Sequence, residues 1–288
     1  MESVITNGQL TAIIKHHGAE LCSLKNKDGV EFIWQADKVI WGRHAPVLFP
    51  IVGKLKNDSY TYNDDKYSLS QHGFARDKKF ELTDITSNKV SFSLKADDET
   101  ISKYPFRFEL LIIYALKENS INVLYEVLNN DRGEMPFSIG AHPGFCCPIS
   151  KDEKFEDYEI RFSDNEKLET ALLKEGLFNG EKKLLAANDN VIKLNADTFI
   201  NDALVFENLK STHVILHSTK SKHFVELSFK GFPYLGIWSK PGAHFVCLEP
   251  WCGKADSVTH DDNIMNKEGI IILKPGKHFS CSYNIKVS

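Results

Sequence analysis

The feature of this sequence that most restricts its fold is a recurring alternation of apolar and polar residues with a period of two. Alternation of this kind places every second side chain on the same face of a β-strand. It occurs in runs rich in β-branched and aromatic residues: 89–95, 107–116, 120–128, 212–217, 223–229, 234–239 and 269–273. Long helical patterns do not separate these runs, so we expect strands to follow one another directly.

The connections between the runs indicate how the strands pair. KEN at 117–119 joins two of the longest runs, and NDDK at 63–66 separates YTY from YSL. Links of this length join antiparallel neighbours, whereas parallel neighbours need a crossover of about a dozen residues or more. We therefore predict an all-β fold in which two large antiparallel sheets pack together.

Length leaves the number of domains open. The chain has 288 residues, and all-β sandwiches commonly reach ~200–250 residues as one domain. The sequence contains neither a linker rich in proline or serine nor a repeat of fixed period, so we expect one domain over residues 1–288. Residues 151–190 carry charge runs and glycines, and we expect a solvated loop region with a short hairpin there.

Charge argues against polyanionic partners. The 39 acidic and 35 basic residues are mixed along the chain and give a net charge of −4. A basic face for nucleic acid or for an anionic membrane is therefore not expected. The start, MESVITNGQL, lacks the pattern of a signal peptide, and apolar runs fall short of the ~20 residues that span a bilayer. We expect a cytoplasmic protein, and the oligomeric state stays open.

The six cysteines are spread thinly, unlike the dense set of a small disulfide-bonded domain. Cys247 and Cys252 have a spacing that zinc sites use, and Cys146 with Cys147 would be the other half. Adjacent cysteines are a poor zinc pair, and free cysteine is a common core residue. We therefore expect reduced, structural cysteines and no metal.

The first stretch with chemical character is QHGFARD, residues 71–77, which contains His72 and Arg76. A His-Gly pair is common in turns, so this motif alone fits a structural role as well as a functional one. Upstream, PVLFPIVGKL at 46–55 carries two prolines and a glycine, which make a poor central strand. This segment could instead present Lys54 at the wall of a cavity.

The second stretch is FSIGAHPGF, residues 137–145, around His142. Pro143 pushes the residue before it towards extended conformations, and the flanking glycines permit close approach of a ligand or another strand. Taken alone, the motif fits a buried histidine whose hydrogen bonds the protein satisfies.

The third stretch is FVCLEPWCGKADS, residues 245–257. Its strand-like start ends in Glu249, Pro250 restricts the backbone of that residue, and Trp251 offers a broad aromatic face. Glutamate is rarely buried without a partner. Glu249 is therefore either exposed at the edge of the sheet or paired for a functional reason.

Two imidazoles, one carboxylate and an aromatic face suit a sugar. An aromatic ring stacks on the apolar face of a pyranose, and polar side chains satisfy its hydroxyls. Interconverting its anomers breaks the bond between C1 and the ring oxygen, which needs a base on the C1 hydroxyl and an acid on the ring oxygen. Glutamate and histidine suit that pairing, with no metal or organic cofactor.

In this order, the motifs resemble those of aldose 1-epimerases of the galactose mutarotase type, near the LacX-like branch. The resemblance runs from GAELCSLKNKDGVEFIWQADKVIW at 18–41, through 46–77, to FVCLEPWCGKADS at 245–257. It implies a galactose mutarotase-like supersandwich, which is a large antiparallel β-sandwich with an open sugar-binding cleft on one face.

The resemblance also implies roles for individual residues. Glu249 matches the general base on the C1 hydroxyl, and His142 matches the general acid on the ring oxygen. His72 matches a second imidazole that holds the ring oxygen. Asp202, in INDALVF, matches an aspartate that binds sugar hydroxyls. Apart from the resemblance, the broad aromatic face of Trp251 is the candidate surface for stacking the sugar.

Two departures leave the substrate open. Where galactose mutarotases place an arginine in the cleft, this chain has Lys54, which lacks the bidentate fork of a guanidinium. The HGFAR motif also occurs in related hexose-6-phosphate mutarotases, in which the arginine equivalent to Arg76 helps to hold the phosphate; Arg43, Lys54 and Arg76 could form such a clamp. A mutarotase for glucose or galactose, a hexose-6-phosphate mutarotase and a non-catalytic carbohydrate-binding protein that stacks its ligand on Trp251 are the alternatives.

Overall fold

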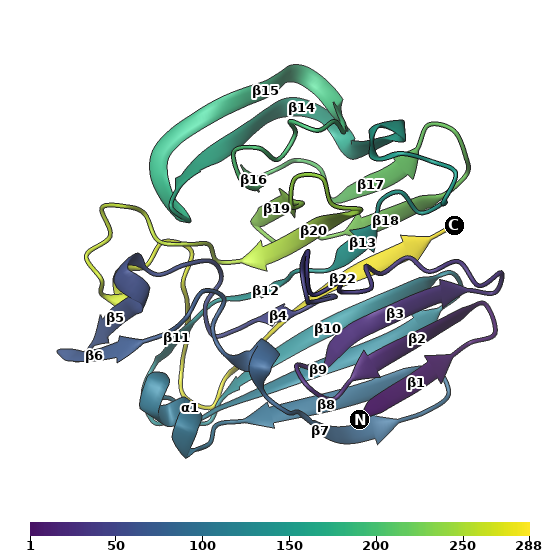
Figure 1. Ribbon diagram of the computed structural model, residues 1–288. Coiled ribbons are helices and arrows are strands. Elements are labelled where there is room, and N and C mark those ends of the chain that lie inside the picture. Colours follow the sequence, from purple (N-terminus) through teal and green to yellow (C-terminus); the bar gives the residue numbers. More distant parts are fainter.

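The computed structural model describes residues 1–288, apart from the side chain of Asn188. The chain folds mainly into antiparallel strands (Figure 1), which confirms the all-β prediction. Its main sheet contains, in spatial order, β4 (Val47–Leu48), β12 (Ile139–Ala141), β20 (Phe245–Cys252), β19 (Tyr234–Trp238), β16 (Leu204–Glu207), β14 (Tyr158–Lys174), β17 (His213–Ser218), β18 (Phe224–Ser228), β22 (His278–Val287), β10 (Ser120–Asn129), β9 (Phe108–Lys117), β8 (Lys89–Lys95) and β7 (Glu81–Ile85). Off this path, β13 (Gly144–Cys146) pairs with β20, and β15 (Leu177–Lys193) pairs with β14.

The remaining elements are small. Three further sheets are formed by β1 (Glu2–Thr6), β2 (Leu10–Lys15) and β3 (Glu20–Asn26), by β5 (Ser59–Tyr62) and β6 (Asp65–Ser68), and by β11 (Met135–Phe137) and β21 (Ile271–Leu273). Helical turns occur at α1 (Asp98–Lys103), η1 (Lys56–Asp58), η2 (Ala75–Asp77), η3 (Phe155–Asp157) and η4 (Ile264–Asn266). Among the residues that the structure describes, no helix combines the length and apolar character that crossing a membrane requires.

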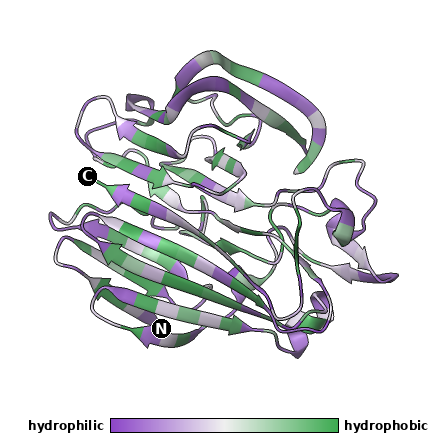
Figure 2. Ribbon diagram, turned by 180° about the vertical axis from the view of Figure 1, so that it is seen from behind, coloured by the Kyte–Doolittle hydropathy of each residue, from purple (hydrophilic) through white to green (hydrophobic). Residues whose placement is uncertain are grey.

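The sheet of β1 to β3 packs across β8, β9 and β10 and closes the core between two layers (Figure 1). Buried and half-buried residues alternate along β9 and β10, as the period of two predicts, and Figure 2 shows this alternation as bands of hydropathy along the strands. The Tyr114 hydroxyl on β9 donates a 2.7 Å hydrogen bond to the carbonyl of Ala19, just before β3. The predicted sandwich is therefore confirmed, although its second layer is a three-stranded sheet and not a second large one.

The expectation for residues 151–190 is wrong. This region holds two strands of 17 residues each, β14 and β15, which form a long ribbon that arches over β16 and β19 (Figure 1). The register shifts repeatedly, for example between Arg161 and Glu166, so no simple period of two survives in the sequence. Much of the ribbon is exposed, which explains its charge runs. Its turn reaches the region of β20.

Strand β20 is the rigid base of the region where the sequence motifs meet. All eight of its residues are buried, and it pairs with β12 and β13 on one side and with β19 on the other. Residues that alternate along a strand share a face. Glu249 and Trp251 therefore project together from a backbone that is held on both edges.

Candidate active site

The floor of the site is the indole of Trp251, which lies against two glycines. Gly140 on β12 pairs with Trp251, and Gly236 on β19 pairs with Glu249. A Cβ at Gly140 would lie 2.7 Å from the indole, and one at Gly236 would lie 2.4 Å from it. Such distances are impossible without displacement, so both glycines are required for the indole to lie flat across the neighbouring strands.

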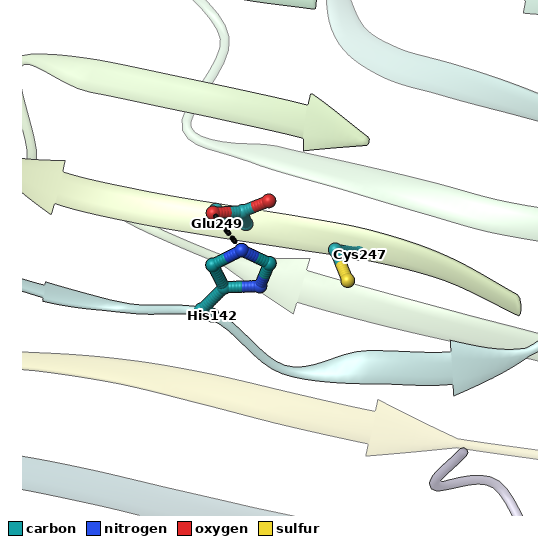
Figure 3. A group of neighbouring side chains, drawn as sticks. All are labelled: His142, Cys247 and Glu249. Carbon is teal, nitrogen blue, oxygen red and sulfur yellow. Dashed lines mark ion pairs between the residues drawn. The ribbon is translucent and has the colours of Figure 1, made fainter. Parts of the chain in front are cut away.

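His142 and Glu249 face each other at this floor (Figure 3). His142 lies in the short connection between β12 and β13, where its backbone N–H donates to the carbonyl of Pro46 at 3.2 Å. Its Nε2 lies 3.2 Å from Oε2 of Glu249, and the two residues are only 8% and 2% exposed. The Trp41 ring stacks on the imidazole with centroids 5.0 Å apart. The orientation of the imidazole is therefore fixed by Glu249 at its Nε2 and by the Trp41 ring on its face.

Burial shifts the proton affinities of this pair in opposite directions. It raises the pKa of Glu249 well above its usual value; the charge of Asp202 adds to the rise and the Trp251 side chain opposes it. Burial also lowers the pKa of His142 to about 3, with Arg76 adding to the fall. Both shifts arise because burial penalises the charged form of each side chain. With one proton on the pair, burial favours a carboxylic acid beside a neutral imidazole over an ion pair.

His72 approaches the same point from the loop before η2. Its backbone is left-handed, with φ of 68°, and its Nδ1 accepts a 3.1 Å hydrogen bond from the N–H of Gly53. Since Nδ1 is an acceptor, the proton of the neutral ring lies on Nε2, which is a donor. Burial lowers the pKa of His72 well below its usual value, and His142 and Arg76 add to this. The rings of His72 and His142 are nearly perpendicular, with centroids 5.6 Å apart.

These groups line a cavity of about 260 Å³. Pockets for drug-sized ligands measure ~300–1,000 Å³, so this volume suits a smaller ligand such as a monosaccharide. The lining includes six of the eight site residues that the sequence indicated: His72, Arg76, His142, Asp202, Glu249 and Trp251.

Arg76 and Asp202 lie at the polar side of the cavity. The Nη2 of Arg76 donates to the carbonyl of Gln71 at 2.6 Å, whereas its buried Nε has no hydrogen-bond partner among the described groups. Burial lowers the pKa of Arg76 to about 10. Asp202 is exposed, with a left-handed φ of 80°, and it accepts the N–H of Ala203 at 2.7 Å. The cavity is thus bordered by one cation and one anion, and the cation is also paired with Asp77, which lies 3.8 Å from its Nε.

The other two residues that the sequence indicated, Arg43 and Lys54, are not part of this lining. Arg43 donates to Asp77 at 2.9 Å. Lys54 packs its aliphatic chain against Gly176, and its Nζ lies 3.4 Å from the carbonyl of Glu175. Lys54 therefore contacts the turn of the β14–β15 ribbon, and the structure does not gather Arg43, Lys54 and Arg76 around one cavity.

The structure adds aromatic and apolar lining that sequence motifs did not indicate. Trp41 and Trp238 enclose His142, with the Trp238 ring 5.9 Å from the imidazole. Phe178 reaches the cavity from the ribbon; its N–H donates to the carbonyl of Asp256 at 2.9 Å. These side chains come from distant segments, so spacing along the chain carries no signal for them.

A third potential ligand atom accompanies the acid and base. Cys247 lies on the same face of β20 as Glu249, two residues earlier. The donor atoms of His142, Cys247 and Glu249 all lie within 4.8 Å of one another, so this group could hold a metal ion.

Comparison with known proteins shows the family and the fold to which this site belongs. A model of the aldose 1-epimerase family matches residues 1–286, and the chain is 34% identical over 293 residues to protein LacX of Lactococcus lactis, covering 98% of both chains. A solved galactose mutarotase related enzyme from Lactobacillus acidophilus has a TM-score of 0.96 at 39% identity, covering 100% of this chain and 97% of that one. A galactose mutarotase-like protein from Lactobacillus casei has a TM-score of 0.94 at 32% identity, covering 100% of both. The resemblance and the supersandwich fold that the motifs predicted are confirmed.

Proposed function

Because this chain belongs to the aldose 1-epimerase family, a family of isomerases, we propose that it is a mutarotase whose substrate is a free aldohexose such as glucose or galactose. The observation that carries this proposal is the buried contact of 3.2 Å between His142 and Glu249 at a cavity of about 260 Å³. An acid and a base held this closely can act together on the two oxygens bonded to one carbon, which is what ring opening requires.

In the proposed reaction, Glu249 takes the proton of the C1 hydroxyl while His142 gives a proton to the ring oxygen. The electron pair of the O–H bond becomes the second bond of the C1 aldehyde, and the electron pair of the broken bond stays on the ring oxygen. Rotation of C1 followed by the reverse proton transfers closes the ring as the other anomer. Protons and electrons balance, so the proposed reaction consumes no cofactor.

The protonation state of the pair fits this proposal. The reaction starts from a carboxylate on Glu249 and an imidazolium on His142. The uncharged pair that burial favours, a carboxylic acid beside a neutral imidazole, contains the same number of protons. Transfer of one proton from the Glu249 carboxyl to Nε2 of His142, across 3.2 Å, converts the uncharged pair into the reactive one without exchange with solvent. A C1 hydroxyl that donates to the carboxylate would stabilise the charged arrangement.

We assign supporting roles to three further lining residues. His72 donates from Nε2 to the ring oxygen, since Gly53 occupies its Nδ1. Trp251 presents its indole to the apolar face of the sugar, and Asp202 at the exposed rim accepts hydrogen bonds from hydroxyls. This division leaves the acid and base free to act at C1.

Polarimetry on freshly dissolved α-D-glucose and α-D-galactose tests the proposal. We expect the protein to accelerate the approach to anomeric equilibrium for at least one of the two sugars, and the variant Glu249→Gln to lose ~10²–10⁴-fold in rate. Equilibration no faster than in buffer for every aldose tried would contradict it. The alternative of a carbohydrate-binding protein without turnover predicts that outcome together with retained sugar affinity.

A second candidate substrate is a hexose 6-phosphate, and one observation favours it. Arg76 lines the cavity with a buried Nε that lacks a hydrogen-bond partner among the described groups, although it lies 3.8 Å from Oδ2 of Asp77, and a guanidinium binds phosphate well. Rates for glucose and glucose 6-phosphate should be compared in the wild type and in Arg76→Ala. A preference for the phosphate that the substitution removes would support this substrate, and equal rates unchanged by the substitution would exclude it.

A further inference from the structure

We infer that His142, Cys247 and Glu249 form a binding site for a borderline-soft divalent cation such as Zn²⁺, and that a metal bound there blocks the reaction. The blocking effect rests on the proposed function, whereas the metal binding does not. The three residues share one small space in Figure 3, with Cys247 and Glu249 on β20 and His142 facing them from the neighbouring connection.

The geometry is close to that of a three-ligand zinc site. The donor atoms lie within 4.8 Å of one another, and donors around a tetrahedral Zn²⁺ are separated by about 3.5 Å. The Cys247 and Glu249 side chains project from the same face of one strand. Rotation of these side chains can therefore bring the donor atoms from within 4.8 Å to the separation of about 3.5 Å that Zn²⁺ requires. The backbone there is held by pairing on both edges, so the ligands need little further ordering.

The donor set also selects the metal. An imidazole nitrogen, a thiolate sulfur and a carboxylate oxygen are the three kinds of atom that Zn²⁺ binds in proteins, whereas Mg²⁺ and Ca²⁺ prefer oxygen alone. The thiolate of Cys247 and the carboxylate of Glu249 would together neutralise a divalent charge. A neutral complex suits a site in which Glu249 is 2% exposed and Cys247 is fully buried.

The fourth coordination position points to the cavity. His142 and Glu249 are part of the cavity lining, whereas Cys247 lies behind them, packed near Trp41 and Trp238. A metal that joins all three would therefore keep its open position towards the sugar, where water or a sugar hydroxyl can bind. Binding forms three bonds to the metal and releases the thiol proton and the proton of the acid–base pair.

This arrangement makes the metal an inhibitor and not a cofactor. The proposed base and the proposed acid both become ligands, so neither can exchange a proton with the substrate. The metal and the sugar should then exclude one another.

Titration with Co²⁺, monitored by absorption spectroscopy, tests the binding directly, because a cobalt–thiolate bond gives a charge-transfer band. We expect the wild type to bind one Co²⁺ with this band. Cys247→Ser should lose the band and bind at least tenfold more weakly. The matched control is Cys146→Ser, because its hydroxyl can replace the thiol that donates to the carbonyl of Ile33; it should keep the band. A wild type without the band, or a band that persists in Cys247→Ser, would overturn the inference.

Two measurements do not depend on how well a variant folds. Crystals of the wild type soaked in Zn²⁺ should give an anomalous peak among His142, Cys247 and Glu249, and a soaked crystal without a peak there would overturn the site. In polarimetry, Zn²⁺ should slow the wild type reversibly, with recovery on adding a chelator. Metal binding without slower turnover would overturn the blocking effect, and a wild type without turnover in metal-free buffer would overturn only the proposed function.

Discussion

Two buried pairs of ionisable groups each have one member on or just beyond β20, and they differ in how closely the partners meet and in whether they line a cavity. Asp256 lies 2.6 Å from Nζ of Lys267, both side chains are 1% exposed, and Asp256 also accepts the N–H of Lys56 at 2.9 Å. In the other pair, His142 and Glu249 meet at 3.2 Å beside a cavity, and Nδ1 of His142 has no partner within the described structure.

This difference indicates that the Asp256–Lys267 pair stabilises the fold, whereas the His142–Glu249 pair acts on a ligand. A buried ion pair in close contact holds its segment in place, and losing one partner leaves an uncompensated charge. A pair with unused hydrogen-bonding capacity at a cavity can exchange its proton with a ligand. Asp256 should therefore matter for stability, and Glu249 for turnover.

The substitution Glu249→Gln should give the largest effect on activity. The variant keeps the shape of the side chain but cannot accept the C1 proton, so we expect kcat to fall ~10²–10⁴-fold. Its thermal stability should be unchanged or higher, because a buried carboxyl whose pKa is raised destabilises the folded state once it ionises. Polarimetry and thermal unfolding check the two halves. Glu226→Gln, outside the cavity on β18, is the matched control and should keep the wild-type rate.

The substitution Asp256→Asn should give the opposite pattern. It leaves Lys267 buried without its counter-charge, and we expect unfolding free energy to fall by ~3–5 kcal/mol. Adding Lys267→Met removes the unpaired charge and should restore part of the loss, while turnover per folded molecule stays within about tenfold of the wild type. Urea denaturation measures the stabilities, and a double variant as unstable as Asp256→Asn alone would remove the contrast between the two pairs.

The pH dependence of kcat/KM should report the shifted pair. The active state carries one proton, so activity is lost when His142 takes a second proton or when Glu249 loses the last one. The pKa of His142 is lowered to about 3 and that of Glu249 is raised well above 4.5. The profile should be bell-shaped, with its acid limb set by His142 and its alkaline limb by Glu249. The profile should be measured in chelator-treated buffer. An acid limb near 4.5 and an alkaline limb near 6.5, which are the ordinary pKa values of glutamate and histidine, would contradict this assignment.

A smaller effect is expected at Lys254, which supports the cavity wall. Its Nζ lies 2.6 Å from both Glu207 and Glu268 and 4.9 Å from the centre of the Phe178 ring. Lys254→Met removes a cation–π contact worth ~1 kcal/mol, so we expect KM to rise about fivefold with a smaller change in kcat. Lys182→Met, which removes the more exposed partner of Glu207, should leave KM unchanged. Equal kinetic effects of the two substitutions would show that the Phe178 contact is not responsible.

Sequence patterns predicted the parts of the fold in which one face of a strand is buried. The runs at 107–116 and 120–128 match β9 and β10 to within one residue, because alternate residues of these strands pack against the core. The β14–β15 ribbon was missed because its register shifts and its exposure remove that alternation. The period of two reflects burial on one face, and it disappears where a ribbon leaves the sandwich.

The site was predictable where motifs fix the backbone and not where distant segments meet. Pro143 and Pro250 mark the chain beside His142 and Glu249, and these two residues do meet. The orientation of Lys54 depends on the turn at Gly176, which belongs to a ribbon that the sequence did not predict. Long side chains follow the partners that the whole fold supplies, and a single sequence does not contain that information.

The most direct test of the central claim is a double-mutant cycle on the rate of mutarotation. If Glu249 and His142 move protons as one unit, Glu249→Gln and His142→Gln should each reduce kcat/KM by ~10²–10⁴-fold, and the double variant should lose little more than either single variant. Thermal unfolding of all three variants controls for folding. Losses that simply multiply in the double variant, or a single variant that retains the wild-type rate, would contradict the account.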